Sequence, residues 1–266
     1  MKKIIYLLLA ALMVTGVTAA QTSKKSKTKK KTTSAAVLPV TKGETKEYGD
    51  YLTTQMFTVK KGKDNQVKVE YPVAGNPALV NAIRSYIKHR LNDKFTGSLD
   101  TPDALLRSAL KGKRDVQFGQ EGESLSQEIT VTYSNPNVIS FKDEGYVYEG
   151  GAHGLPWMSG ASFLTSDGTI LNIDMMPSFS RMKPYVMQGI ADDYNVSVRD
   201  LDDILFNADE VNDYPGTVYI TADGLKFIYQ PYEIAPFSAG APTAVIPATS
   251  NIIDMLSPAG RKFFAK

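Results

Sequence analysis

The sequence predicts an α+β fold, with one or more mostly antiparallel sheets, helices packed on one side, and two sequential subdomains. Three observations support this prediction. Short runs such as Glu128 to Tyr133 alternate apolar and polar residues, the pattern of a half-buried antiparallel strand. Turn sequences such as Ser166-Asp167-Gly168-Thr169 separate consecutive runs. Helical periodicity interrupts the β runs instead of following every strand, which favours α+β over a doubly wound parallel sheet.

The composition excludes several ways of stabilising or anchoring the chain. The 266 residues include no cysteine, so the chain has no disulfide framework, no thiolate metal ligand or nucleophile, and no cysteine for a lipid anchor. With 42% hydrophobic residues, it is long enough for one good-sized domain or two small ones held by a packed core.

The N-terminus has the features of a secretory signal peptide, which we place at residues 1–20. Lys2 and Lys3 precede an apolar stretch from Ile4 to Val17, and small residues suited to signal peptidase follow. The stretch is short for a membrane span of about 20 residues. We therefore expect a periplasmic or secreted protein with no transmembrane span after signal cleavage.

A basic linker is expected at residues 21–47. Eight of the 30 basic residues and none of the 28 acidic residues lie in residues 1–31, so residues 32–266 carry 22 basic and 28 acidic residues, a net charge of −6. The lysine tract is either a polybasic tether to anionic wall polymer or lipid head groups, or a solvated spacer. Export argues against nucleic acid as a partner.

The N-terminal subdomain is expected at residues 48–124. Alternation from Tyr51 to Val73 breaks at Lys61 to Asn65, which predicts a hairpin. Asn76 as N-cap and Pro77 at the first helical position begin a helix, and Thr101-Pro102 repeats the signal for a short helix to about Leu110. The first helix carries one apolar stripe: Leu79, Val80, Ile83, Tyr86, Ile87 and Leu91.

The C-terminal subdomain is expected at residues 125–266. A meander of strands comes first, then a helix from Ser180 to about Tyr194, a shorter helix ending at Phe206, and two more strands. The expected strands are Glu128 to Tyr133, Val138 to Asp143, Tyr146 to Glu149, Ser159 to Leu164, Ile170 to Ile173, Thr217 to Thr221 and Leu225 to Gln230.

Two segments at strand exits carry the functional signal. The first is Tyr148-Glu149-Gly150-Gly151-Ala152-His153-Gly154, where glycines allow a sharp turn around one histidine. The second is Gln230-Pro231-Tyr232-Glu233-Ile234-Ala235-Pro236-Phe237-Ser238-Ala239-Gly240, where two prolines end strand pairing and stiffen the loop. We expect the two bends to lie at neighbouring sheet margins and to form one docking surface.

These two segments resemble the extracytoplasmic domain of RsiV-type anti-sigma factors. That domain also occurs beside the catalytic domain of PdaC-type peptidoglycan deacetylases and as stand-alone secreted proteins. The resemblance runs from about Gln127 to Leu256, and a less specific N-terminal companion covers roughly Tyr48 to Ser124. In the RsiV type this region binds lysozyme, so the resemblance implies an envelope binding module whose partner is a lysozyme-like muramidase or peptidoglycan.

The chain also departs from these relatives. An anti-sigma factor needs a cytoplasmic segment ahead of its membrane helix, and only Met1, Lys2 and Lys3 precede the apolar stretch here, so we expect no sigma-factor binding. The metal-binding Asp and His motif of the deacetylase part is absent from the sequence.

The candidate partner-binding residues each have a structural alternative. His153 either offers a hydrogen bond at the mouth of a groove or pins its own turn. Trp157, the only tryptophan, is either a contact or part of the core. Tyr232 and Glu233 either face a partner or lock the loop by hydrogen bonds. The full set is Gly150, Gly151, His153, Gly154, Trp157, Pro231, Tyr232, Glu233 and Pro236; no catalytic, metal-binding or cofactor-binding residue is predicted.

Three functions are open at this point. The first is a non-catalytic exported binding protein that engages a wall component or a lysozyme-like muramidase, favoured by the acidic folded part. The second is a peptidoglycan hydrolase or deacetylase with Glu233 and His153 as acid and base, which would need a second carboxylate such as Glu149 or Asp143. The third is a structural envelope protein whose basic tail binds wall polymer.

Overall fold

The computed structural model describes residues 37–111, 123–207, 211 and 216–265. Residues 37–266 form one compact unit. The signal peptide predicted at residues 1–20, and residues 21–36 of the predicted linker, lie outside the described residues. Among the helices of the described part, none combines the length and the apolarity needed to cross a membrane.

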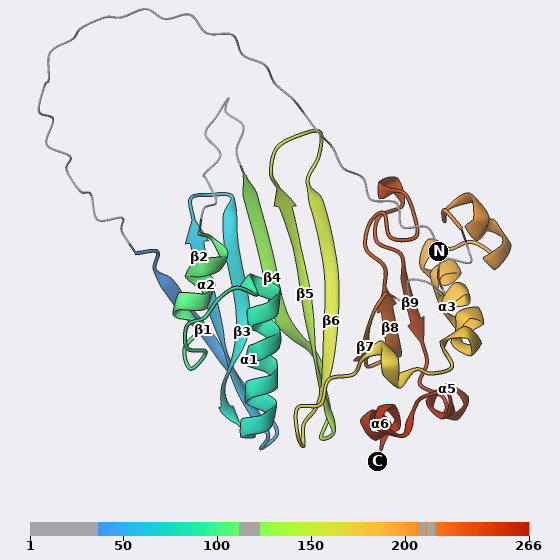
Figure 1. The fold of residues 1–266 in the computed structure, drawn as a ribbon, viewed down its shortest axis with the longest axis horizontal. Coiled ribbons are helices and arrows are strands. Elements are labelled where there is room, and N and C mark those ends of the chain that lie inside the picture. Colours follow the sequence, from blue (N-terminus) through green and yellow to red (C-terminus); the bar gives the residue numbers. More distant parts are fainter. Residues whose placement is uncertain (1–36, 112–122, 208–210, 212–215, 266) are drawn as a thin grey trace, which may run out of the picture. The chain divides into compact units, whose positions relative to one another are not determined.

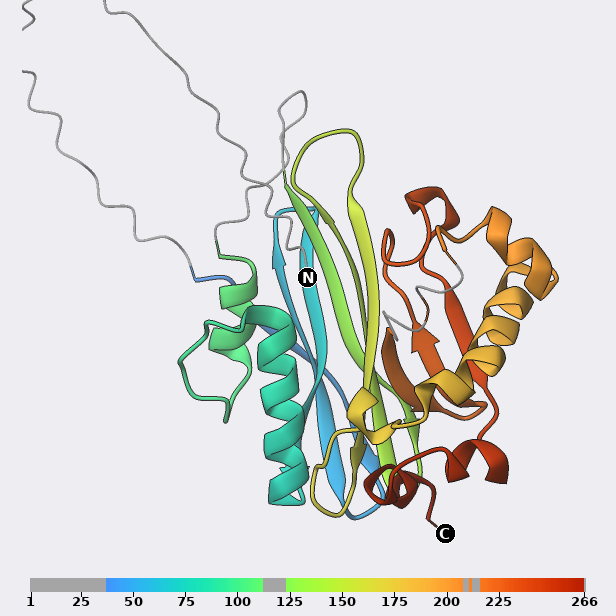
Figure 2. The ribbon, with the colours of Figure 1, turned by 45° about the vertical axis from the view of Figure 1, so that its right-hand side comes forward.

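The described strands form two sheets that lie in layers with the helices. A six-stranded sheet has the order β1-β2-β3-β4-β5-β6, and a three-stranded sheet has the order β7-β8-β9. Helices α1 and α2 cover one face of the large sheet, the small sheet lies against the opposite face, and α3 covers the far side of the small sheet (Figures 1 and 2). All pairings are antiparallel except that of β3 with β4, so the predicted α+β class is confirmed.

The first half of the large sheet follows the predicted hairpin and helices. Strands β2 (Leu52–Lys61) and β3 (Asn65–Gly75) pair around the predicted turn. Helix α1 (Pro77–Asn92) begins as expected, with the Asn76 side chain accepting a hydrogen bond from the amide of Ala78. Its stripe packs on the sheet, and α2 (Asp103–Ala109) packs beside it.

Residues 40–47, which the sequence assigned to the linker, instead form most of the edge strand β1 (Val40–Tyr48). The strand buries little side-chain surface, so its sequence shows no alternation. It is held by its backbone pairing with β2 and by Tyr48, whose hydroxyl donates to Glu70 Oε1 at 2.5 Å. Lys42 and Lys46 on this edge are typical of strands that avoid further pairing.

Glu70 closes the junction between the two halves of the large sheet. The parallel pairing of β3 with β4 (Ser124–Ser134) spans only residues 65–69 of β3. Just beyond it the buried Glu70 carboxylate accepts hydrogen bonds from Thr54 and from the amide of Val131. The side chain thus satisfies a β4 donor that the diverging strands leave unpaired.

The second half of the large sheet contains one long strand where two were predicted. β5 (Val138–Tyr148) continues through Gly145 and pairs with β6 (Leu155–Leu164). Gly145 does not end the strand because it lies opposite Trp157, whose ring would come within 2.2 Å of a Cβ there. The glycine makes room for an aromatic ring on the next strand.

The small sheet and its helix complete the chain. Strands β7 (Thr217–Thr221) and β8 (Gly224–Ile228) match the prediction, whereas β9 (Thr243–Ile246) was not predicted. Helix α3 (Phe179–Tyr194) ends at Asn195, which has the left-handed conformation that closes helices. The remaining short elements are η1 (Ile173–Met175), η2 (Val198–Asp203), η3 (Phe237–Ala239), α5 (Ser250–Asp254), α6 (Pro258–Arg261) and η4 (Lys262–Phe264).

Two predicted elements are smaller than expected. The strand expected at Ile170 to Ile173 is reduced to a single bridge between Ile170 and Phe163, followed by η1. The helix expected before Phe206 is the 3₁₀ segment η2, which starts with a capping box between Ser197 and Asp200.

Buried apolar side chains form two cores. One lies between the large sheet and α1 and α2, and its residues end at Phe163. The other joins the small sheet, α3 and the C-terminal helices. Two sequential subdomains therefore describe the packing, with the cores dividing near Leu164 apart from Val138, which belongs to the second core. The large sheet runs continuously past the boundary expected at residues 124 and 125.

Candidate partner-binding surface

The glycine loop, residues 149–154, joins β5 to β6. Gly150 and Gly151 have φ of +96° and +98°, and nothing lies within 4 Å of a Cβ built on either, so backbone conformation alone selects glycine there. Gly154 is glycine for another reason, because the Tyr146 ring would come within 2.2 Å of its Cβ. Tyr148 donates its hydroxyl proton to the carbonyl of Gly151 at 2.9 Å and closes the loop.

The proline loop, residues 230–240, is tied by its own hydrogen bonds. The amide of Gln230 donates to Glu233 Oε2 at 2.6 Å, and the amide of Glu233 donates to the carbonyl of Gln230 at 3.0 Å. Tyr232 sits at the tip with φ of +71°, a left-handed conformation that is unusual for a bulky side chain, yet it is 54% exposed. Glu233 therefore holds the loop, while Tyr232 projects from it.

The two loops meet through three stacked rings. The His153 ring lies 4.1 Å from Phe237, at an interplanar angle of 23°, and the Tyr232 ring lies 5.6 Å from the same phenylalanine at 28°. Phe237 is thus the shared neighbour that brings His153 and Tyr232 together. We call His153, Phe237 and Tyr232 the ring stack.

A backbone-to-side-chain contact fixes the spacing of the loops. The Gln230 side chain donates to the carbonyl of Met158 and accepts from the amide of the same residue at 3.3 Å. Its amide group thereby takes the place of a neighbouring strand at the free edge of β6. Since Met158 and Gly154 belong to the same hairpin, this contact ties the proline loop to the glycine loop.

His153 serves its own turn as well as the ring stack. Its side chain is exposed, and Nδ1 lies 3.0 Å from the carbonyl of Gly154. A carbonyl only accepts hydrogen bonds, so Nδ1 carries the proton in this contact. In a neutral imidazole with its proton on Nδ1, the remaining nitrogen, Nε2, is an acceptor.

Trp157 lies outside the ring stack. It is half-buried, packs with the core beneath α1, and donates its indole proton to Asp143 Oδ1 at 3.3 Å. Asp143 is fully buried, forms an ion pair with Arg90 of α1 at 2.5 Å, and accepts a hydrogen bond from Gln127. The structure thus anchors Trp157 to a buried network.

The arrangement bears on the carboxylate pair that hydrolysis would need. Burial raises the pKa of Glu233, opposed by the hydrogen bond from Gln230. Asp143 is committed to its ion pair with Arg90 beneath α1, so it does not provide an exposed second carboxylate. Glu149 is exposed at the start of the glycine loop. Within the described residues, no three His, Asp or Glu side chains gather as a metal site.

Sequence reasoning missed several exposed apolar side chains around the ring stack. Tyr146 is 42% exposed and Leu155 44%, and they flank the glycine loop on β5 and β6. Phe206 is 55% exposed, and its amide donates to the carbonyl of Ile234 in the proline loop. Their grouping depends on tertiary contacts. Only Tyr146 had a sequence signal, because it lies in an expected strand that leads directly into the glycine loop.

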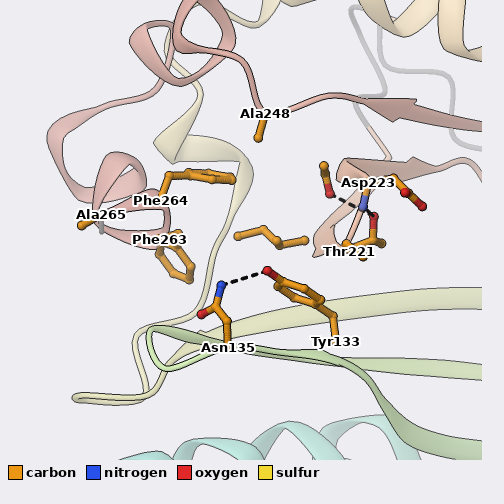
Figure 3. Close-up of a pocket in the computed structure, with 11 residues that line it drawn as sticks. Tyr133, Asn135, Thr221, Asp223, Ala248, Phe263, Phe264 and Ala265 are labelled. Atoms are coloured by element: carbon orange, nitrogen blue, oxygen red, sulfur yellow. Dashed lines mark hydrogen bonds between the residues drawn. The ribbon is translucent and has the colours of Figure 1, made fainter.

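Two of the surface hollows in the described part of the chain have volumes of about 390 Å³ each. One, which we call the sheet hollow, adjoins the glycine loop and is lined by Ser126, Glu128, Glu144, Gly145, Tyr146, Pro156, Trp157 and Met158. The other is lined by Tyr133, Asn135, Thr221, Asp223 and the C-terminal residues Phe263 to Ala265, among others (Figure 3). In Figure 3 Asn135 points to the Tyr133 hydroxyl, and the two side chains are joined by a hydrogen bond of 2.9 Å. None of the predicted site residues lines this second hollow.

Comparisons with known proteins match two successive parts of the chain. Residues 58–156 match a family described as "Deacetylase PdaC", and residues 176–249 match a family described as "Protein of unknown function (DUF3298)". The fold is similar to the crystal structure of a DUF3298 family member from Bacteroides fragilis, with 16% identity, 83% of this chain and 100% of that chain covered, and a TM-score of 0.57. A DUF3298 family protein from Pseudomonas aeruginosa has 16% identity, coverage of 84% and 95%, and a TM-score of 0.50. No curated protein matches.

These matches fit a chain in which a PdaC-type region precedes a DUF3298-type region, and they suggest an envelope-associated protein. The unmatched residues between them, 157–175, contain the last buried residue of the first core, Phe163, and, apart from Val138, the first of the second core, Leu164.

Proposed function

We propose that the protein is a non-catalytic, exported binding protein of the cell envelope, which engages a lysozyme-like muramidase or a wall component through the ring stack. The observation that carries the proposal is the stacking of both His153 and Tyr232, from two different loops, on the ring of Phe237. Rings that are exposed and already ordered lose little entropy on binding, and aromatic side chains are frequent anchors of interfaces.

The bonding of Glu233 favours binding over hydrolysis. A general acid must present its proton to the substrate, and one oxygen of this carboxylate is used by the Gln230 amide inside the loop. The competing candidate is a deacetylase, favoured by the description of the family that matches residues 58–156.

The charge of the folded part favours a basic partner. Residues 32–266 carry a net charge of −6, and opposite fields speed encounter and reject like-charged partners. A cationic muramidase of the lysozyme type fits this requirement better than an anionic polymer.

The test is a binding assay with the purified protein, a c-type lysozyme and isolated peptidoglycan sacculi. We expect a stable complex with lysozyme and loss of muramidase activity, or retention on sacculi, at about 10 μM protein. Phe237→Ala should weaken the complex at least about tenfold, because it removes the ring that both neighbours contact. Tyr185→Ala is the matched control, since Tyr185 is 44% exposed on α3.

Two outcomes would contradict the proposal. One is the absence of binding to both probes. The other is release of acetate from peptidoglycan that depends on Glu233 or His153, which would favour the deacetylase candidate.

A further inference from the structure

The sheet hollow lies on the face of the large sheet turned away from α1. Leu125, Ile129 and Phe141 point to the core beneath α1, so the alternate residues Glu128 on β4 and Glu144 on β5 point the other way. Apolar walls are supplied by Tyr146, Pro156 and Met158.

The walls of the sheet hollow are fixed in place. The Tyr146 ring lies against Gly154, where any Cβ would displace it, and the backbone of Met158 is held in both directions by the Gln230 side chain. Because Gly154 adjoins His153 and Gln230 begins the proline loop, the two loops that carry the ring stack also hold the walls of the hollow.

The two glutamates have an arrangement that the fold itself does not favour. Glu128 and Glu144 are direct cross-strand partners, and like charges in that position are destabilising. Lys68 contacts Glu128 Oε1 at 2.7 Å and Lys142 contacts Glu144 Oε2 at 2.9 Å. Among the described residues, the second oxygen of each carboxylate has no hydrogen-bond partner, and both side chains are about two-fifths exposed.

We propose that the sheet hollow is a subsite for an arginine side chain of a basic protein partner. The inference rests on the proposed function, since it gives the partner of the same surface a chemical class. A guanidinium is planar, stacks on an aromatic face such as Tyr146, and donates to two carboxylate oxygens at once. Lys68 and Lys142 each occupy one carboxylate oxygen, and a guanidinium can donate to the remaining oxygen of both glutamates at once while its plane lies on the aromatic wall. This combination favours the side chain of a protein partner over a neutral sugar, which would use the aromatic wall without a charged donor.

The test uses probes that need no identified partner. Tyr146 ring and Met158 methyl NMR signals are followed during titration with N-acetyl-arginine amide, with the citrulline analogue as the neutral, isosteric control. We expect saturable shifts with the arginine probe at millimolar concentration and binding of the citrulline probe about tenfold weaker or less. The double change Glu128→Gln and Glu144→Gln should abolish the difference between the probes.

Matched variants separate this proposal from the proposed function. Phe237→Ala should leave the arginine response intact while it weakens the protein complex, and Glu47→Gln, an exposed glutamate on β1, should change neither. Tyr146→Leu keeps an apolar wall without the aromatic face and should weaken arginine binding.

Three results would overturn the subsite: equal response to arginine and citrulline, no response to about 50 mM arginine probe, or stronger shifts with an N-acetylglucosamine oligomer than with arginine. The last would assign the surface to glycan. If Phe237→Ala loses the lysozyme complex while the unmodified protein shows no arginine response, the arginine subsite is contradicted and the proposed function is still supported.

Discussion

Trp157 and Tyr232 are two aromatic residues near the margins of neighbouring sheets, and they differ in burial: the first packs into the core and the second projects from the surface. Trp157 packs beneath α1, with its indole proton on the buried Asp143. Tyr232 is 54% exposed and holds a left-handed backbone conformation at the tip of the proline loop. One region gains stability from its aromatic ring, whereas the other holds its ring outside the core at a cost.

The difference shows that residue type does not separate a core aromatic from a contact aromatic. The surroundings separate them. Trp157 has a buried carboxylate and a glycine on the neighbouring strand, whereas Tyr232 has a strained backbone and one stacked ring, Phe237. Backbone strain at a residue whose side chain stays exposed, as at Tyr232, points to a functional role for that residue. The comparison can therefore be tested on each side by measuring stability and binding separately.

The largest expected effect is on the Trp157 side. Asp143→Ala leaves Arg90 without its partner and frees both the indole and Gln127, so it should lower the free energy of unfolding by about 3 kcal/mol. Urea denaturation followed by tryptophan fluorescence measures this. The remaining folded protein should bind its partner as before, because the ring stack is untouched.

The control for this prediction is the exposed pair of His89 and Asp93, at the same C-terminal end of α1 that carries Arg90. Asp93→Ala should leave the unfolding midpoint nearly unchanged, because solvent screens the pair. Equal losses in the two variants would mean that the network around Asp143 contributes no more than a surface pair. Replacing Arg90 and Asp143 together by apolar residues should recover part of the loss.

A smaller effect is expected at Tyr232, where glycine should stabilise the protein more than alanine does, the reverse of the usual order. Tyr232→Gly and Tyr232→Ala both remove the ring and its stacking, so their difference reports the backbone alone. Alanine is normally the more stable of the two, but at φ of +71° glycine should be more stable by about 1 kcal/mol.

Thermal denaturation of both variants measures this difference, and both should lose partner binding. The same pair of changes at Tyr185, inside α3, is the control, where alanine should be more stable. If alanine is also more stable at position 232, the proline loop relaxes in solution and Tyr232 carries no strain.

How far the sequence predicted the fold depended on how local each signal is. Asn76 and Pro77 start α1 through contacts within a few residues, and the turn at Lys61 to Asn65 likewise marks its hairpin. The sequence predicts separate strands that end at Asp143 and begin at Tyr146, because the reason for the glycine between them, the Trp157 ring opposite Gly145, lies on another strand. β1 was missed because an exposed edge strand held by backbone bonds shows no apolar alternation.

The candidate surface was predictable in outline only. The glycine and proline loops are visible as strand exits, and their convergence follows from Gln230 reaching Met158. The role of Phe237, whose ring contacts both His153 and Tyr232, could not be predicted, because a phenylalanine that follows a proline in a loop commonly packs on its own loop. The buried role of Trp157 depends on Asp143, a residue that the sequence placed at a strand end.

The smallest expected effect concerns the pH dependence of the proline loop. Burial raises the pKa of Glu233, so the folded state holds this proton more tightly than the unfolded chain does. The resulting stabilisation is fully present below the unfolded pKa and is lost as the pH rises through the folded pKa. Glu233→Gln removes this titration and keeps an acceptor for the Gln230 amide. At neutral pH the variant should therefore melt slightly higher than the unmodified protein, by about 1 °C, and the difference should vanish near pH 4.

Melting curves of both proteins between about pH 4 and pH 7 measure this difference, in which all other titrating groups cancel. The shift is small because Glu233 is only half-buried and solvent screens its charge. A variant that melts lower at neutral pH would show that the bond from the Gln230 amide to the carboxylate outweighs the cost of burying the charge. Glu233 would then lock the proline loop more strongly when ionised, and the ring stack would be most ordered at neutral pH.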